Sequence, residues 1–463
     1  MAVTGPGGAE SERPSAVGST PGSTSSSGPQ AAGTSPSGPQ AAGAPPSSPQ
    51  AAGPPAAGTP SSGPPSFGVE EEYFLVDPAS GRIVDAAERV LARARAEPGA
   101  GDAVTGEFTR YQVEVRTPPC TTSGELRAAL AELRRSTARA ARAEGLRLCA
   151  SGTPVLGEPT PDAIGAHPRY RAGLAQYRSM MRDFTLCAQH VHVHCPDRER
   201  AVLVGNHLRP VLPGLVALSA NSPYHAGHDT DYASWRAAVR QRFPCLGPPP
   251  YAVSLAQSRQ QAEVIAAAGA MLDPALPFWD VRPNPRFPTV EVRCPDVAAE
   301  LEDAVAMAAL VRALVTVADR RAARGDPGPR VGAEELRAAY WQAARDGTAG
   351  EAVDLATGRT VPGFEPVLGL LARVRETLEA TGDWDLVRVR VRRVLAGGAG
   401  AEAQRRAAGK VGLSGLVRAL ADATELGAPE DAAAGAPGEG REGPPRSAVA
   451  EGAGGAATWR KRG

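Results

Sequence analysis

The amino-acid sequence predicts an α+β fold, in which flanking helices pack on a curved, largely antiparallel sheet. Segments with the alternation of a strand are interleaved with segments of helical periodicity. They do not form a regular βαβ repeat, which argues against a doubly wound parallel sheet. The chain has 463 residues, of which 42% are hydrophobic, and this is enough for at least one large core.

The composition divides the chain into three parts. Residues 1–65 are almost entirely Gly, Pro, Ala, Ser, Thr and Gln and repeat the unit SGPQAAG, so we predict a disordered leader, because so few apolar side chains cannot offset the entropy lost on ordering. Residues 427–463 are similar in composition and are predicted to be a disordered tail. Residues 66–426 are therefore predicted to form one folded domain.

The first predicted element of this domain is the strand FGVEEEYFLV at 67–76, which is rich in β-branched and aromatic residues and ends at Asp77-Pro78. Four further strands are predicted from alternation or apolar character, at 109–119, 146–151, 188–195 and 289–294. Helices are predicted from apolar residues spaced three or four apart, at 123–145, about 170–183, 197–220 and 296–324.

Several of these strands carry charged or imidazole side chains at alternate positions. Residues two apart in a strand project from the same face. The pairs and triplets of this kind are Glu70 and Glu72, Glu114 and Arg116, Glu291 and Arg293, and His190, His192 and His194. If the strands belong to one sheet, one of its faces is lined by acids, imidazoles and guanidiniums and backed by an apolar layer.

Such a face needs counter-charge. Two carboxylates about 4 Å apart repel by about 4 kcal/mol at an effective dielectric constant near 20, so grouped acids need raised pKa values or bound cations. Carboxylate oxygens suit Mg²⁺ or Mn²⁺, and these ions commonly accompany phosphates. The alternative is that the acids are solvated positions of amphipathic strands that pair with Arg across the sheet. A second alternative is a zinc-dependent hydrolase built on HVHVHC at 190–195, which would leave the acidic strands unexplained.

Two loops rich in polar residues are candidates for binding groups. NSPYHAGHDTDYASWR at 221–236 contains Asn221 and Arg236, and FWDVRPNPRFP at 278–288 brings Arg282 close to the strand at 289–294. Arg binds carboxylate or phosphate with two parallel hydrogen bonds. Taken singly, each of these arginines is more typical of a surface residue.

Charge and sequence signals narrow the class of protein. The net charge of +0 argues against a nucleic-acid-binding protein. The sequence contains no secretory signal, and no apolar stretch of about 20 residues that would span a bilayer. The six cysteines form no CxxC pair. We therefore expect a cytoplasmic protein with reduced thiols that does not bind a membrane.

The ordered motifs GVEEEYFLV, QVEVRTPPC, CASGTP, HPRY, QHVHVHC, LSANSPYHAGHDTDYASWR and WDVRPNPRFPTVEVR resemble those of the bacterial glutamate–cysteine ligase type 2 family, the carboxylate–amine ligases. The resemblance covers about residues 66–425. It implies a glutamine synthetase-like catalytic domain that uses ATP and Mg²⁺ (or Mn²⁺) to phosphorylate a carboxylate, which an amine then attacks. It also implies weak glutamate–cysteine ligase activity, on glutamate or a similar carboxylate and cysteine or another amine; homo-oligomerisation is left open.

The resemblance also implies roles for individual residues. The metal carboxylates would be Glu70, Glu72, Glu114 and Glu291. The nucleotide contacts would be His192, Arg116 and Asn221. The groups that hold phosphate or the acidic substrate would be Arg236, Arg282 and Arg293. Glu71, between two predicted ligands, points to the other face and is predicted to be structural.

Two positions depart from the family pattern. His194 stands where the family usually has glycine, and Trp235 stands where a small residue is usual. Both put the substrate in doubt but leave the reaction type intact. A catalytically inactive binding scaffold of the same fold is a further alternative, against which the intact set of glutamates argues.

Overall fold

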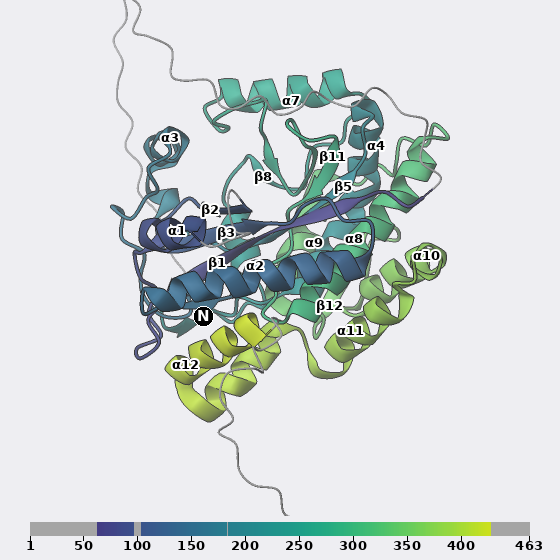
Figure 1. The fold of residues 1–463 in the computed structure, drawn as a ribbon. Helices are drawn as coiled ribbons and strands as arrows, with labels where there is room; N and C mark the ends of the chain where they lie inside the picture. Colours follow the sequence, from purple (N-terminus) through teal and green to yellow (C-terminus); the bar gives the residue numbers. More distant parts are fainter. Residues whose placement is uncertain (1–62, 97–102, 183, 427–463) are drawn as a thin grey trace, which may run out of the picture. The chain divides into compact units, whose positions relative to one another are not determined.

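The computed structural model describes residues 63–96, 103–182 and 184–426, and the structural statements below concern this part of the chain (Figure 1). The predicted catalytic domain, 66–426, falls within these residues apart from the two gaps. Residues 1–62 of the predicted leader and the predicted tail at 427–463 lie outside them.

A seven-stranded sheet forms the centre of the domain. Its strands are β1 (Phe67–Val76), β2 (Val104–Gly106), β3 (Gln112–Arg116), β4 (Arg147–Cys149), β5 (Gln189–His194), β10 (Val281–Pro283) and β11 (Thr289–Val292). The order is β10-β11-β5-β1-β3-β2, and β4 also pairs with β1. All of these pairings are antiparallel, which confirms the predicted α+β fold with a largely antiparallel sheet.

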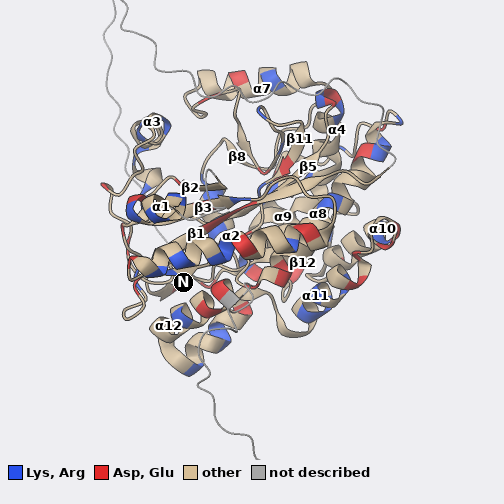
Figure 2. Cartoon of the chain, in the orientation of Figure 1, with Lys and Arg blue, Asp and Glu red and all other residues tan. Residues whose placement is uncertain are grey.

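Helices surround this sheet (Figure 1). They are α1 (Ala87–Ala96), α2 (Ser123–Ala143), α3 (Pro168–Tyr177), α4 (Arg198–Leu208), α5 (Leu212–Ser219), α6 (Trp235–Arg240), α7 (Leu255–Ala267), α8 (Leu301–Ala322), α9 (Ala333–Asp346), α10 (Glu365–Thr381), α11 (Trp384–Gly397) and α12 (Gly400–Leu426). Short two-stranded pairs are formed by β6 (Tyr224–His225) with β7 (His228–Asp229), β8 (Leu246–Gly247) with β9 (Phe278–Trp279), and β12 (Glu351–Asp354) with β13 (Arg359–Pro362). Most helices carry both acidic and basic residues (Figure 2).

Two of the predicted helices differ from the observed ones. The helix predicted at 197–220 is interrupted by a 3-10 turn at Arg209–Val211, because Pro210 cannot donate the backbone hydrogen bond that a continuous helix requires. The helix predicted at 296–324 begins only at Leu301. Among the described residues, one helical segment, Arg198–Ser219, is long and apolar enough to cross a membrane, but 89% of its apolar window is buried inside the domain, as in a core helix.

The strand register brings the predicted polar residues onto one face. Glu70 lies opposite Arg116 on one neighbouring strand and opposite His190 on the other. His192 in turn lies opposite Glu291. Directly opposed residues of an antiparallel pair share a face, so the alternating acids, imidazoles and guanidiniums form one surface.

The other face of the sheet packs on helices and forms the core. Val69 of β1 and Val191 of β5 belong to one buried cluster with Leu126 of α2 and Ala308 of α8. Helix α2 begins one residue after the cap Thr122, whose side chain accepts a hydrogen bond from a backbone N–H of the first turn. The burial of these apolar side chains holds the sheet against its helices and fixes the orientation of the polar face.

Glu71 is a charged residue on this apolar face. Its carboxylate accepts hydrogen bonds from Nε (3.0 Å) and Nη2 (2.8 Å) of Arg134, which extends from α2, and the hydroxyl of Tyr73 also donates to it. The Glu71 and Arg134 side chains are both fully buried. The structure therefore places Glu71 opposite to its two acidic neighbours, in a buried ion pair that links β1 to α2.

Candidate active site

The first of two groups of possible metal ligands is formed by Glu70, His192 and Glu291, each of which offers one ligand atom within 4.8 Å of the others. Glu70 Oε2 is 3.1 Å from Nδ1 of His190, and Glu70 Oε1 is 3.4 Å from Nε2 of His192. Burial opposes the ionisation of Glu70, but hydrogen bonds with the two imidazoles hold its pKa below the ordinary value. Glu70 is therefore a carboxylate rather than a carboxylic acid.

His190 is neutral at physiological pH. Burial and the nearby charge of Arg293 lower its pKa to about 3, and the attraction of Glu70 only partly opposes this. A neutral imidazole donates or accepts a hydrogen bond and can ligate a metal, but it brings no positive charge to the acids. The positive charge of this face comes from guanidinium groups.

Glu291 is held by three residues at once. It accepts from Nε (3.0 Å) and Nη2 (3.1 Å) of Arg282, from Nδ2 of Asn284 (2.6 Å) and from Nη1 of Arg293. Burial raises the pKa of Glu291, but the charges of Arg293 and Arg282 outweigh it and hold that pKa well below its usual range. Nε of Arg293 is buried and has no hydrogen-bond partner among the described residues, so this guanidinium retains a donor for a bound anion.

The second group consists of Glu72, Glu107 and Glu114, whose carboxylate oxygens again lie within 4.8 Å of one another. Burial and the charge of Glu114 raise the pKa of Glu72 to about 7. Burial and the charge of Glu72 raise the pKa of Glu107 to about 8. Burial and the charge of Glu70 raise the pKa of Glu114 well above its ordinary value. The protein alone thus disfavours ionisation of all three groups, and a divalent cation held by their oxygens would permit it.

Glu107 was missed by the sequence reasoning. It follows β2 directly and precedes β3, so it lies in a connection, where the alternation of a strand gives no side-chain direction. The sequence does place Glu107 in the short connection that leads into the strand carrying Glu114. A short connection keeps its residues close to the sheet.

Arg116 lies on the polar face, with Nε 3.6 Å from Oε1 of Glu114. The charge of Arg236 opposes the rise that burial causes in the pKa of Glu72, so Arg236 also acts on the acids. Its Nη1 and Nη2 donate to the backbone carbonyls of Cys294 (2.9 Å) and Arg293 (3.0 Å), so Arg236 fixes the backbone that carries Arg293. Its Nε has no hydrogen-bond partner among the described residues, and the contact of Arg236 with substrate stays a prediction.

Asn221 is held by backbone carbonyls. Its Nδ2 donates to the carbonyls of Ala150 (3.2 Å) and Val297 (2.8 Å), and its side chain borders a different cavity. These contacts do not test the contact of Asn221 with the nucleotide, which stays a prediction. Asn221 and Arg236 were assigned from a loop, in which spacing does not determine where a side chain points.

The histidines and cysteine of HVHVHC do not converge. Cys195 points away from His190 and His192, with Sγ 3.7 Å from Oδ1 of Asp319 on α8, and burial raises its pKa to about 12. His194 is exposed at the end of β5. Within the described residues, both groups of possible metal ligands consist mainly of carboxylates, which suit Mg²⁺ or Mn²⁺ better than zinc.

The two positions that depart from the family pattern lie at the edges of the site-forming elements. The exposed side chain of His194 does not fill the space between Glu70 and Glu291. Trp235 begins α6, and its ring packs edge-on against Tyr232 with centroids 5.3 Å apart. Neither residue disturbs the two carboxylate groups.

Comparison with known proteins places this geometry in context. The family model described as glutamate-cysteine ligase family 2 matches residues 66–420. A Saccharopolyspora erythraea protein named "Putative glutamate--cysteine ligase 2-2" is 45% identical over 363 residues, which cover 78% of this chain and 92% of that protein. A Salinispora arenicola protein named "Putative glutamate--cysteine ligase 2" is 42% identical over 347 residues, with 73% and 89% coverage.

Two solved structures have the same fold at low identity. The glutamate–cysteine ligase of Francisella tularensis, in complex with AMP, matches with a TM-score of 0.61 at 11% identity and covers 80% of this chain and 90% of its own. A bifunctional glutathione synthetase of Pasteurella multocida matches with a TM-score of 0.57 at 17% identity, over 79% of this chain and 52% of its own.

Proposed function

Since this chain belongs to glutamate–cysteine ligase family 2, we propose that it is an ATP-dependent ligase that joins the carboxyl group of glutamate to the amino group of cysteine. The observation that carries this proposal is the single sheet face on which two groups of carboxylates lie beside Arg282 and Arg293. The substrates could also be another carboxylate and another amine, and the assay below distinguishes these pairs from glutamate and cysteine.

The proposed reaction has two steps. A carboxylate is a poor electrophile, so one of its oxygens first attacks the γ-phosphorus of ATP, which forms an acyl phosphate and releases ADP. The amine nitrogen then attacks the acyl carbon, a C–N bond forms, inorganic phosphate leaves and the nitrogen loses a proton. Both steps move negative charge between phosphate oxygens, which a site stabilises by placing cations where that charge develops.

The described residues fit a divalent cation in each carboxylate group. The first would be held by Glu70, His192 and Glu291, and the second by Glu72, Glu107 and Glu114. Together the two groups supply five carboxylates and one imidazole, and carboxylate oxygens suit a hard divalent cation. The raised pKa values of Glu72 and Glu107 in the second group are those expected where the counter-charge is lacking. When bound, Mg²⁺ would neutralise the phosphate oxygens of the nucleotide.

The chain's own groups position the anionic substrates. Glu291 holds Arg282 and Arg293 in fixed directions, and the unpartnered Nε of Arg293 can donate to a phosphate or carboxylate oxygen. Arg116, beside Glu114, supplies a further cation at the edge of the acids. Arg236 contributes indirectly, because it fixes the backbone of Arg293.

The test is release of ADP from ATP by the full chain, with glutamate and cysteine and with other amino-acid pairs, in Mg²⁺, in Mn²⁺, in zinc and in excess EDTA. We expect release that requires Mg²⁺ or Mn²⁺ together with a carboxylate and an amine. Turnover that persists in EDTA, or hydrolysis that needs zinc and no nucleotide, would show that the protein is not such a ligase.

Glu291→Gln provides the matched test of the site. It should lower turnover by about 100-fold or more, on the scale of losing a preorganised charge contact. Glu88→Gln, an exposed acid on α1, is the control and should leave turnover unchanged. Equal turnover in the two variants would show that the carboxylate face takes no part in the reaction.

A further inference from the structure

Phe287 is a large apolar side chain that stays exposed beside the candidate active site. It lies in the connection between β10 and β11 and is 51% exposed. Its ring lies edge-on to the ring of His192, with centroids 6.2 Å apart and an angle of 84° between the two planes. His192 belongs to the first group of possible metal ligands, and the next side chain on the same face of β5, His194, is exposed. Phe287 therefore stands at the open end of the polar face, next to the residues that would hold a cation.

The backbone at Phe287 is held by the same side chain that holds Glu291. Oδ1 of Asn284 accepts from the backbone N–H groups of Arg286 (2.8 Å) and Phe287 (2.9 Å), while Nδ2 of Asn284 donates to Glu291 (2.6 Å). The backbone N–H of Thr289 also donates to the carbonyl of Phe287 (2.8 Å). These bonds fix the chain at Phe287 relative to the first group of possible metal ligands, so a ligand that binds there does not have to order this connection.

The aromatic rings beside the second group of acids are packed against one another instead. Phe108, which follows Glu107 directly, is buried and packs on Tyr170 and Phe184 with ring centroids 5.6 Å and 6.0 Å apart. Within the described residues, the contact with His192 is the only contact of the Phe287 ring with another ring or with a guanidinium. Phe287 thus has a ring face that a ligand can cover.

A nucleotide has two parts that match this arrangement. Its phosphates are bound through a divalent cation, and its base is a flat aromatic surface that stacks on Phe whatever the base. Arg286, which is exposed next to Phe287, adds positive charge that favours an anionic ligand. We propose that the base of the bound nucleotide stacks on Phe287, beside the first group of possible metal ligands. This inference rests on the proposed function, because it requires the phosphates of a nucleotide at the carboxylate face.

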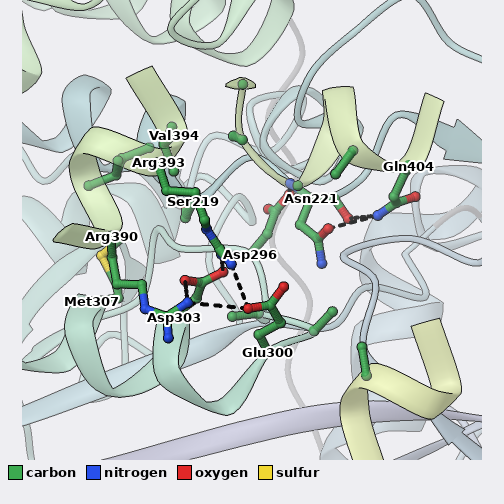
Figure 3. Close-up of a pocket in the computed structure, with 18 of the residues that line it drawn as sticks. Ser219, Asn221, Asp296, Glu300, Asp303, Met307, Arg390, Arg393, Val394 and Gln404 are labelled. Carbon is green, nitrogen blue, oxygen red and sulfur yellow. Dashed lines mark hydrogen bonds and ion pairs between the residues drawn. The ribbon is translucent and has the colours of Figure 1, made fainter. Parts of the chain in front are cut away.

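The cavity shown in Figure 3 is not an alternative place for the base. It has a volume of about 420 Å³, and helices α8, α11 and α12 form most of its wall. The sheet contributes Gln189, which lies opposite Glu71 in the register and therefore projects from the face that packs on helices. None of the described residues in the two metal-ligand groups lines this cavity, so a nucleotide whose phosphates they hold does not place its base there.

The test measures binding rather than turnover. ADP and inorganic pyrophosphate share a diphosphate and differ in the nucleoside, so titration calorimetry with the full chain in Mg²⁺ separates the two parts of the ligand. Phe287→Ala should weaken the binding of ADP by at least about 5-fold, as expected for the loss of one stacked base, and leave the binding of pyrophosphate unchanged. Phe364→Ala, at a residue that is 43% exposed just before α10, is the matched control and should bind both ligands as the wild type does.

A fluorescence measurement reports the stacking itself. Phe287→Trp keeps an aromatic face at this position and should bind ADP about as tightly as the wild type. The emission that the added indole contributes should fall when ADP is added, because a stacked base quenches it, and should not change when pyrophosphate is added.

Three results would overturn the inference. Unchanged binding of ADP by Phe287→Ala would show that the base does not stack on this ring. Equal weakening of ADP and pyrophosphate would show that the ring only supports His192, and both of these results would leave the proposed function standing. No binding of ADP by the wild type would overturn the inference together with the proposed function.

Discussion

Replacing Glu72 by glutamine should stabilise the metal-free protein at high pH and leave it unchanged at low pH. The Glu72 side chain is buried beside Glu107 and Glu114, and burial together with the charge of Glu114 raises its pKa from 4.5 to about 7. Because the folded-state pKa lies above the unfolded-state value, this group favours the folded state less and less as pH rises from about 4.5 to about 7.

The magnitude follows from the size of the shift. One pKa unit corresponds to about 1.4 kcal/mol, so ionisation of Glu72 lowers the free energy of unfolding by about 3 kcal/mol above pH 7. Glutamine carries no charge, and its oxygen can still accept from the backbone N–H of Ala188, which donates to Glu72 Oε2 at 2.7 Å. The variant should therefore gain up to about 3 kcal/mol at pH 8 and almost nothing at pH 4.

The assay is urea denaturation in excess EDTA at intervals from about pH 4 to about pH 8, for the wild-type chain and for Glu72→Gln. The difference in unfolding free energy should open as pH rises from about 4.5 to about 7 and stay constant above that. Added Mg²⁺ should stabilise the wild type more than the variant. A constant difference across this pH range, or a variant that is less stable than the wild type at pH 8, would refute the reasoning.

Two other expectations follow from the same strands. Glu71→Gln leaves the buried guanidinium of Arg134 without its counter-charge and should lower the unfolding free energy by about 3–5 kcal/mol, measured by denaturation; wild-type stability would contradict the ion pair. The imidazole of His190, whose pKa is lowered to about 3 by burial and a neighbouring guanidinium, should show no titration in its NMR signals between about pH 5 and 8 in the metal-free protein; a midpoint near 6.5 would disprove its neutrality.

The polar face was predictable because a strand has a side-chain period of two. That period alone places Glu70 and Glu72 on one face with Glu71 on the other, and the structure has this arrangement. The partner of Glu71 was not predictable, because Arg134 lies on a helix whose rotation about its axis depends on packing against the sheet. The alternation of residues within a strand predicts the face to which a side chain points, but it does not predict which residue far along the chain that side chain contacts.

Other parts of the structure were not predicted. Glu107 joins the acids from a connection, where no sequence period fixes the backbone direction. The helices after residue 324, α9 to α12, were also not predicted.

The order of strands in the sheet has a consequence for biosynthesis. The central strand β1 is made first and pairs with β5, which in turn pairs with β11, and the ribosome adds β5 and β11 much later. A nascent chain that ends before β5 contains Glu70, Glu72 and Glu114 without the imidazoles, and without the guanidinium of Arg293 that follows β11. The imidazoles and the Arg293 guanidinium reach these acids only after the long-range pairing of β1 with β5 and of β5 with β11. We therefore infer that the site is assembled late.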